Sequence, residues 1–129
     1  FARKVLSKET QLQELNLMMN SIDFRKAKEI ATVFPELQQL QKLTLSWNQI
    51  GDLGTTAIAR SVNHLTRLQE LDLYYNNIGD TGATAIANSI NELTQLQELD
   101  LRYNNISSTA KQQLKQQFGN LIALDKDIF

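Results

Sequence analysis

The chain repeats one eleven-residue pattern every 28 residues, and this period constrains the fold more than any other feature. The four copies begin at Leu12, Leu40, Leu68 and Leu96 and read LQELNLMMNSI, LQKLTLSWNQI, LQELDLYYNNI and LQELDLRYNNI. A fixed period of about 20 to 50 residues is typical of proteins that stack one supersecondary unit on the next. Since each unit contacts only its neighbours, we expect an elongated stack stabilised by the interfaces between units.

Each unit predicts a strand, a turn and a helix in that order. In the third copy Leu71 and Leu73 alternate with polar residues, which is the pattern of a short strand with its leucines facing the interior. Further along, apolar residues recur at spacings of four and three, which is one stripe of an amphipathic helix. In this copy the stripe consists of Ile86, Ile90 and Leu93.

Capping residues predict where the helices begin and end. Asp52, Asp80 and Ser108 are the expected N-caps of three successive helices, because their side-chain oxygens can accept hydrogen bonds from the first helical turn. Gly79 and Gly82 are expected to allow a sharp turn and a close helix–strand approach. The helices should end at equivalent positions, near Asn91 in the third unit, because asparagine tolerates the left-handed conformation found at C-caps. The corresponding residues elsewhere are Pro35, Asn63 and Gly119.

An asparagine follows every predicted strand. Its side chain carries donors and an acceptor, so it can satisfy backbone groups that a tight turn would leave unpaired. The sequence therefore predicts a structural asparagine ladder along the stack. Its members are Asn20, Asn48, Asn76 and Asn104.

The order strand–helix–strand predicts parallel strands joined by right-handed crossovers. Strands in a sheet are about 4.8 Å apart, whereas packed helices need roughly 8–10 Å. The stack should therefore bend, with a parallel sheet on its concave side and helices on its convex side. The predicted fold class is an α/β right-handed solenoid.

The motif L-x-x-L-x-L-x-x-N-x-I, followed by G-D-x-G-x-x-A-I-A-x-S, resembles the ribonuclease-inhibitor-like class of leucine-rich repeats, from Leu12 to about Leu124. The resemblance implies intracellular protein recognition. The class includes ribonuclease inhibitors, sensor regions of NOD-like receptors in innate immunity, actin-capping tropomodulins, activators of the GTPase Ran, and bacterial effectors. The first and last repeats depart from the G-D-x-G turn. The resemblance implies the scaffold and leaves the ligand open.

The repeat register also predicts the organisation of the chain. Residues 1–11 are interpreted as the tail of a preceding repeat helix, and residues 124–129 as a partial fifth repeat that caps the C-terminal end. In that last segment Asp127 stands where the second leucine of the motif belongs. The four complete repeats are expected at 12–39, 40–67, 68–95 and 96–123.

Composition excludes several classes of function. The net charge is −1 and the sequence pI is about 5.8, so no bulk attraction for nucleic acid is expected. No apolar run is long enough to insert through a membrane. The chain has no cysteine and a single histidine, His64, without catalytic partners nearby, so we predict no metal site, no cofactor and no catalytic residues. The absence of cysteine-rich caps favours an intracellular, cytoplasmic protein.

The outward strand positions predict where a protein partner binds. Trp, Tyr and Arg are enriched at interface hot spots, and methionine offers adaptable apolar contact. Aspartates beside the rings would favour a partner with an apolar anchor flanked by basic side chains. The alternative is that the rings are partly buried under the following loop. The predicted binding residues are Met18, Met19, Trp47, Asp72, Tyr74, Tyr75, Asp100, Arg102 and Tyr103.

Three functions are compatible with these features. The first is a non-catalytic protein-binding module that forms the recognition part of a longer intracellular protein. The second is an assembly subunit that self-associates through an exposed end of the solenoid. The third is a GTPase activator of the Ran type, for which Arg102 on a strand and Arg60 on a helix are poorly placed. The close pair Asp72 and Asp100 could raise the pKa of one carboxyl, but an open sheet does not favour catalysis.

Overall fold

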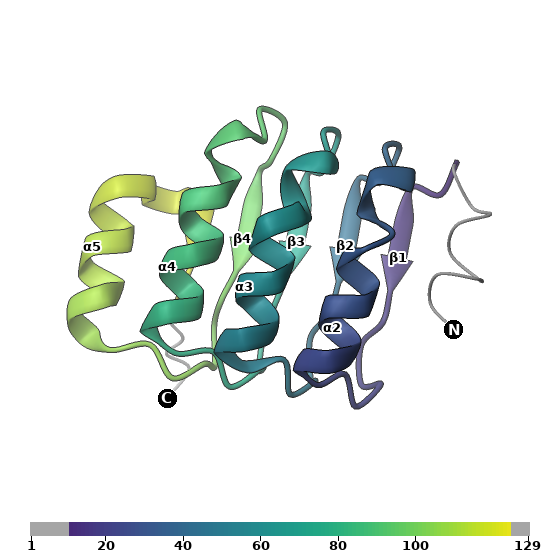
Figure 1. Ribbon diagram of the computed structural model, residues 1–129. Coiled ribbons are helices and arrows are strands. Elements are labelled where there is room, and N and C mark those ends of the chain that lie inside the picture. Colours follow the sequence, from purple (N-terminus) through teal and green to yellow (C-terminus); the bar gives the residue numbers. More distant parts are fainter. Residues whose placement is uncertain (1–10, 125–129) are drawn as a thin grey trace.

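Five strands pair in chain order into one parallel sheet in the computed structural model, which describes residues 11–124. Helices cover one face of this sheet and lie side by side along it (Figure 1). The strands are β1 (Glu14–Asn16), β2 (Lys42–Thr44), β3 (Glu70–Asp72), β4 (Glu98–Asp100) and β5 (Ile122–Ala123). The helices are α2 (Phe24–Ala31), α3 (Gly51–Ser61), α4 (Asp80–Ser89) and α5 (Ser108–Phe118). The predicted strand–turn–helix plan of each repeat is confirmed.

The inward leucines form columns across the sheet. The strands pair so that Leu43, Leu71 and Leu99 lie side by side, each 28 residues from the next. Two residues further along each strand, Leu45 and Leu73 are fully buried. Burying each leucine contributes on the order of 1.5–3 kcal/mol. The columns are therefore the main apolar contribution to the stack.

The helical stripe completes the core from the other side. Each of the four helices is followed by a short 3₁₀ turn, so the stripe continues beyond the α-helix. In the second repeat Ile58, Val62 and Leu65 are fully buried, and in the first repeat so is Phe34. The turns are η1 (Phe34–Glu36), η2 (Val62–His64), η3 (Ile90–Glu92) and η4 (Gly119–Leu121).

The side chains of the ladder asparagines join each turn to the turn of the preceding repeat. Nδ2 of Asn76 donates to the carbonyl of Leu45 at 2.8 Å and to the carbonyl of Leu73 at 3.3 Å, while its Oδ1 accepts from the amide of Ile50. Asn48 and Asn104 make the equivalent bonds. Asn20, in the first described repeat, is exposed and donates to the carbonyl of Met18. These bonds satisfy the buried backbone of the turns.

Asn76→Ala should lower the free energy of unfolding by roughly 2–3 kcal/mol, because it leaves buried carbonyls and an amide without partners. Urea denaturation followed by circular dichroism measures the change. Asn63→Ala is the matched control, since Asn63 is exposed in the turn η2 and has no positive φ. An equal loss in both variants would contradict a special role for the ladder position.

The helix caps differ from the prediction. Oδ1 of Asp52 accepts from the amides of Gly79 and Gly82, both at 2.8 Å, so it caps α4 of the next repeat. The carboxylate of Asp80 likewise accepts from the amide and hydroxyl of Ser107 in the next repeat. Both aspartates lie within the first turn of their own helix, so their carboxylates extend sideways to the neighbour. The predicted capping of their own helices is wrong.

Two further boundaries also need correction. The N-cap of α5 is Ser107 and not Ser108, since the hydroxyl of Ser107 accepts from the amide of Ala110. Asn91 lies inside η3 without a positive φ, because the helix tightens into a 3₁₀ turn instead of ending in the left-handed conformation. At Gly119 the prediction is confirmed: α5 ends there with φ of 60°.

Gly82 lies close to the preceding repeat. A Cβ atom on this residue would lie 2.7 Å from Oδ1 of Asp52 and 3.2 Å from its Cα. Only glycine therefore allows Asp52 to reach the start of α4. The φ of Gly79 is −98°, so the predicted sharp turn at that residue does not require glycine.

Asp52→Ala should destabilise the chain by about 1–2 kcal/mol, the usual cost of losing a helix cap. Hydrogen exchange should accelerate at the amides of Gly79 and Gly82, in the helix after the substitution. Asp23→Ala provides the contrast, because Asp23 caps its own helix through the amides of Arg25 and Lys26. Faster exchange at the start of α3 alone would contradict capping between repeats.

The last strand departs from the 28-residue register. Leu99 pairs with Ile122, only 23 residues later, and Asp100 pairs with Ala123. The turn at Gly119 returns the chain to the sheet early, so β5 forms before Leu124, where the fifth repeat is expected to start. The predicted helix tail falls on residues 1–10 and the predicted C-terminal cap on residues 125–129, and both lie outside the described residues.

Candidate functional site

Four aromatic rings lie together at the ends of the strands. The rings of Trp47 and Tyr75 are stacked, with centroids 4.2 Å apart and planes 17° from parallel. Tyr74 and Tyr103 form a second stacked pair at 5.0 Å, and Trp47 lies 6.1 Å from Tyr74, which links the two pairs. The guanidinium of Arg102 lies over the ring of Tyr74, 5.4 Å from its centroid. Trp47, Tyr74, Tyr75 and Tyr103 are called the aromatic cluster below.

Three rings of the cluster stand on unusual backbone. Trp47, Tyr75 and Tyr103 have φ between 57° and 59°, as does Met19 at the equivalent position of the first repeat. The left-handed conformation costs a residue with a Cβ roughly 1–2 kcal/mol. Asparagine or glycine would adopt it more easily. The turn therefore does not explain why these positions carry large apolar side chains.

The cluster is accessible to a partner. Met19 is 70% exposed, Trp47 45% and Tyr75 46%, whereas Tyr74 and Tyr103 are half-buried. Trp47 and Tyr75 thus keep large free surfaces although their rings stack on each other, and Met18 and Met19 are exposed near them. The exposed large apolar residues of the described chain all lie between a strand end and the first turn of a helix. They are Met18, Met19, Phe24, Trp47, Leu53 and Tyr75.

The acidic residues contribute less free charge than expected. Asp100 is only 8% exposed, and its carboxylate accepts from the side chain of Arg102 at 2.8 and 3.0 Å. Glu70 lies 3.6 Å from Lys42, so it is also partly neutralised. Asp100, one of the predicted binding residues, is therefore not an exposed side chain of the sheet. Asp100 instead positions Arg102, whose pKa it raises through their hydrogen bonds.

Asp72 is half-buried next to Asp100, and the pKa of its carboxyl is raised. The main cause is burial, and repulsion from Asp100 adds to it, whereas a hydrogen bond from the amide of Tyr74 acts in the opposite direction. The expected mutual repulsion is therefore a secondary cause. A neutral side chain can make the same hydrogen bond: in the first repeat Oδ1 of Asn16 accepts from the backbone amide of Met18.

Asp72→Asn should raise the melting temperature at pH 7. Because the pKa of Asp72 is higher in the folded state than in the unfolded state, protonated Asp72 stabilises the fold at low pH. This stability is lost as the pH rises through the folded-state pKa, so the ionised carboxylate is unfavourable at neutral pH. The gain should shrink at pH 3, where Asp72 is protonated. Thermal melts at both pH values measure it.

Asp23→Asn is the control of opposite sign. Hydrogen bonds from the amides of Lys26 and Arg25 lower the pKa of Asp23, so its ionised form stabilises the fold at neutral pH. This variant should melt at a lower temperature than the parent at pH 7. The interpretation of Asp72 would be wrong if both variants moved in the same direction.

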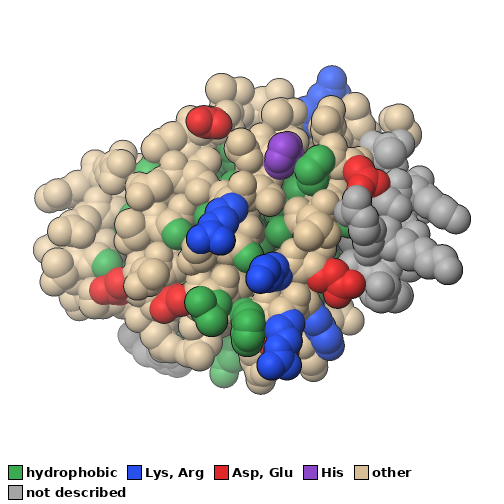
Figure 2. Space-filling model, viewed as in Figure 1, with side chains coloured by type: hydrophobic (Ala, Val, Ile, Leu, Met, Phe, Trp, Pro, Cys, Tyr) green, Lys and Arg blue, Asp and Glu red, His purple; other side chains and the backbone are tan. Residues whose placement is uncertain are grey.

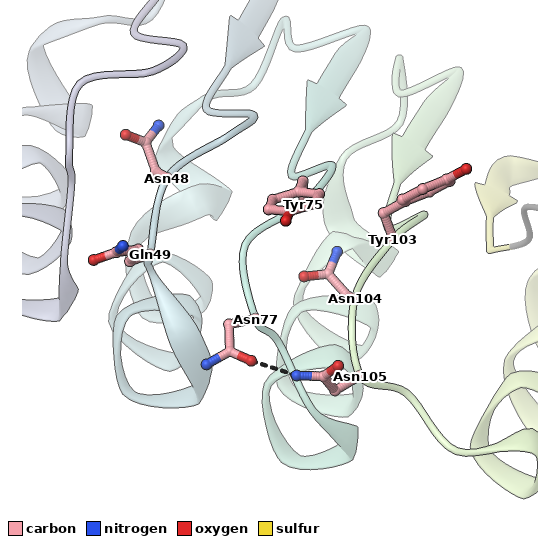
Figure 3. A pocket seen from close by; sticks show the side chains of 7 residues that line it. All are labelled: Asn48, Gln49, Tyr75, Asn77, Tyr103, Asn104 and Asn105. Atoms are coloured by element: carbon pink, nitrogen blue, oxygen red, sulfur yellow. Dashed lines mark hydrogen bonds between the residues drawn. The ribbon is translucent and has the colours of Figure 1, made fainter.

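An open groove of about 640 Å³ adjoins the cluster where the strands run into the helices. Figure 3 shows Tyr75 and Tyr103 above it and asparagine side chains from three successive loops along it. A smaller groove lies beside it and includes Met19 and Trp47. The larger groove is lined by Asn48, Gln49, Tyr75, Asn77, Tyr103, Asn104 and Asn105.

Gln49, Asn77 and Asn105 are the site residues that sequence reasoning missed. They occupy one column of the repeat, directly after the ladder asparagine, and all three are exposed. Nδ2 of Asn105 donates to Oδ1 of Asn77 across the two repeats. The recurrence of amide side chains in one repeat column was the available signal.

Residues 11–124 contain neither a cluster of metal ligands nor a membrane-spanning helix. No group of three or more acidic or histidine side chains there could hold a metal ion. None of the helices in this part of the chain combines the length and apolar character needed to cross a membrane. Seen from the helix side, Lys and Arg side chains gather over the lower parts of α2 and α3, away from the sheet (Figure 2). They include the exposed Arg25, Lys26 and Lys28 of α2.

Solved structures with a similar fold are known, although their sequences differ from this one. No curated protein matches the sequence significantly. Among solved structures, actin-binding site 2 of leiomodin-1 is similar, with a TM-score of 0.79 and 16% identity, over 98% of this chain and 78% of that one. The C-terminal domain of tropomodulin from Caenorhabditis elegans also has a TM-score of 0.79, with 10% identity, over 95% of this chain and 82% of that one. These likenesses show the fold.

The family follows from the sequence itself. The model described as Leucine Rich repeat matches residues 37–59, 64–87 and 92–110, just over half of the chain. The matched segments contain the strands β2, β3 and β4 and most of α3 and α4. The chain belongs to the leucine-rich repeat family.

Proposed function

We propose that this chain is a non-catalytic protein-binding module of the ribonuclease-inhibitor-like class, and that it forms the recognition part of a longer cytoplasmic protein. The observation that supports it best is the aromatic cluster with its exposed methionines. A partner that covered it would remove several large apolar surfaces from water at one place, which contributes about 25 cal/mol per Å². Tryptophan, tyrosine and arginine are also the usual hot-spot residues.

The surroundings of the cluster favour a partner with an apolar anchor and basic flanks. Glu14 and Glu98 are exposed on the strands beside it, and Asp72 is half-buried between them and the rings. The guanidinium of Arg102, which lies over the ring of Tyr74, is already bound to Asp100. Basic side chains of a partner would therefore meet more acidic than basic groups, and they would steer its approach.

The arginine does not favour the GTPase-activator alternative. A residue that stabilises a transferring phosphate must extend into the partner's active site. The side chain of Arg102 is instead held back by two hydrogen bonds to Asp100 and by the ring of Tyr74.

For the assembly alternative, in which the chain self-associates through an exposed end of the solenoid, light scattering of the purified chain is the direct measurement.

Replacing Trp47 and Tyr75 together by asparagine should abolish capture of the natural partner in pull-downs from extracts of the source organism. Asparagine suits the left-handed backbone at both positions, so the fold should be retained, as circular dichroism can verify. Loss of two hot-spot rings is expected to weaken binding at least about a hundredfold.

Phe24→Ser and Leu53→Ser are the matched controls, because both side chains are exposed and apolar but lie on helices outside the cluster. Equal capture by the folded double variant would refute the proposal. Actin is the first defined protein to test by cosedimentation, because one of the structures with this fold is an actin-binding site.

A further inference from the structure

The larger groove exists because neighbouring rings turn in different directions. Tyr75 stacks on Trp47 of the preceding repeat, while Tyr103 stacks on Tyr74. The two tyrosines are equivalent by repeat register, yet they do not stack on each other. Figure 3 shows the resulting gap between Tyr75 and Tyr103, with the amide side chains of the loops along it. The groove thus has a tyrosine ring at each side, and asparagine and glutamine side chains line it between them.

The lining is uncharged. It consists of two tyrosines, four asparagines and one glutamine. A phosphate or a carboxylate would therefore find no cation in the groove, and a lysine or arginine would find no carboxylate. The chemistry selects a neutral ligand that combines apolar surface with hydrogen-bonding groups.

The groove offers side-chain groups and few backbone groups. The amides of Gln49 and Asn105 donate to the carbonyls of Ile22 and Ile78, and the amide of Ile78 donates to Asn104. Asn48 and Asn104 are committed to the ladder. The exposed side-chain amide groups of Gln49 and Asn77 remain available as donors. Asn77 uses only its Oδ1, which accepts from Asn105, so its NH₂ group stays available.

We propose that this groove binds a proline-rich segment of the protein partner in the polyproline II conformation. The inference rests on the proposed function and names the chemistry of the partner. Proline rings are apolar and fit between aromatic side chains, and proline carbonyls need donors only, because the residue has no N–H. The extended polyproline helix is already formed in the free peptide, so binding orders little additional chain.

A partner in an ordinary β-strand fits less well. Each of its residues would need both an acceptor for its N–H and a donor for its carbonyl. The backbone amides of Gln49, Ile78 and Asn105 already donate within the repeat stack, and the strands of the sheet end before the groove. The side-chain donors and the two rings match the needs of proline more closely.

Blocked decaproline is the probe, titrated into the full 129-residue chain by isothermal calorimetry. We expect saturable binding that Tyr75→Asn or Tyr103→Asn weakens about tenfold each. Nuclear magnetic resonance should show shifts of the side-chain amides of Gln49 and Asn77. Asn63→Ser is the control, since Asn63 is exposed on the helix side of the stack and should leave binding unchanged.

The absence of saturation at millimolar decaproline would overturn the inference. An affinity for decaproline that neither tyrosine substitution changes would also overturn it. Maltohexaose is a second probe: saturable binding of this sugar without binding of decaproline would assign the groove to neutral saccharides and also overturn it. Each result is separable from the proposed function. If the Trp47 and Tyr75 double variant loses its natural partner while decaproline never binds, only the present inference fails.

Discussion

The fold depends on hydrogen bonds that cross from one repeat to the next at the turn after each strand. A short strand supplies few ladder bonds, and the chain turns sharply while still buried. Asn48, Asn76 and Asn104 satisfy the carbonyls and amides of two successive turns at once. An apolar residue there would leave those groups buried without partners, at a cost of about 1–3 kcal/mol for each group. The asparagines therefore hold the leucine columns in register.

The candidate site is a consequence of the same turn. To bring the asparagine inward, the residue before it adopts the left-handed conformation in all four repeats. Its side chain then stands outside the core, at the carboxyl edge of the sheet. Large apolar residues at these positions pay a backbone cost and gain contact with one another. Stacking compensates part of that cost, and the faces that remain free are available for recognition.

Neighbouring repeats also supply polar groups to each other at the helix starts. Asp52 and Asp80 each serve the repeat that follows, so the first turn of one helix is completed only when the previous repeat is folded. Near the sheet, Asp100 restrains Arg102 and leaves the aromatic cluster with a mild acidic surround. Such bonds make adjacent repeats cooperate, beyond the burial of apolar surface.

The 28-residue period alone determined the strand, turn and helix of each repeat, the buried leucines and the asparagine positions, because these depend on spacing within one unit. It also singled out the residues of the aromatic cluster. Only the tertiary structure decided which neighbour each polar group serves: the carboxylate of Asp52 reaches a different repeat, Asp100 is buried, and β5 pairs five residues early. The pairing of rings and the groove between Tyr75 and Tyr103 depend likewise on contacts between repeats. The sequence pattern specifies which side chains each repeat carries. Which group of a neighbouring repeat each side chain contacts depends on distances that exist only once the repeats are stacked.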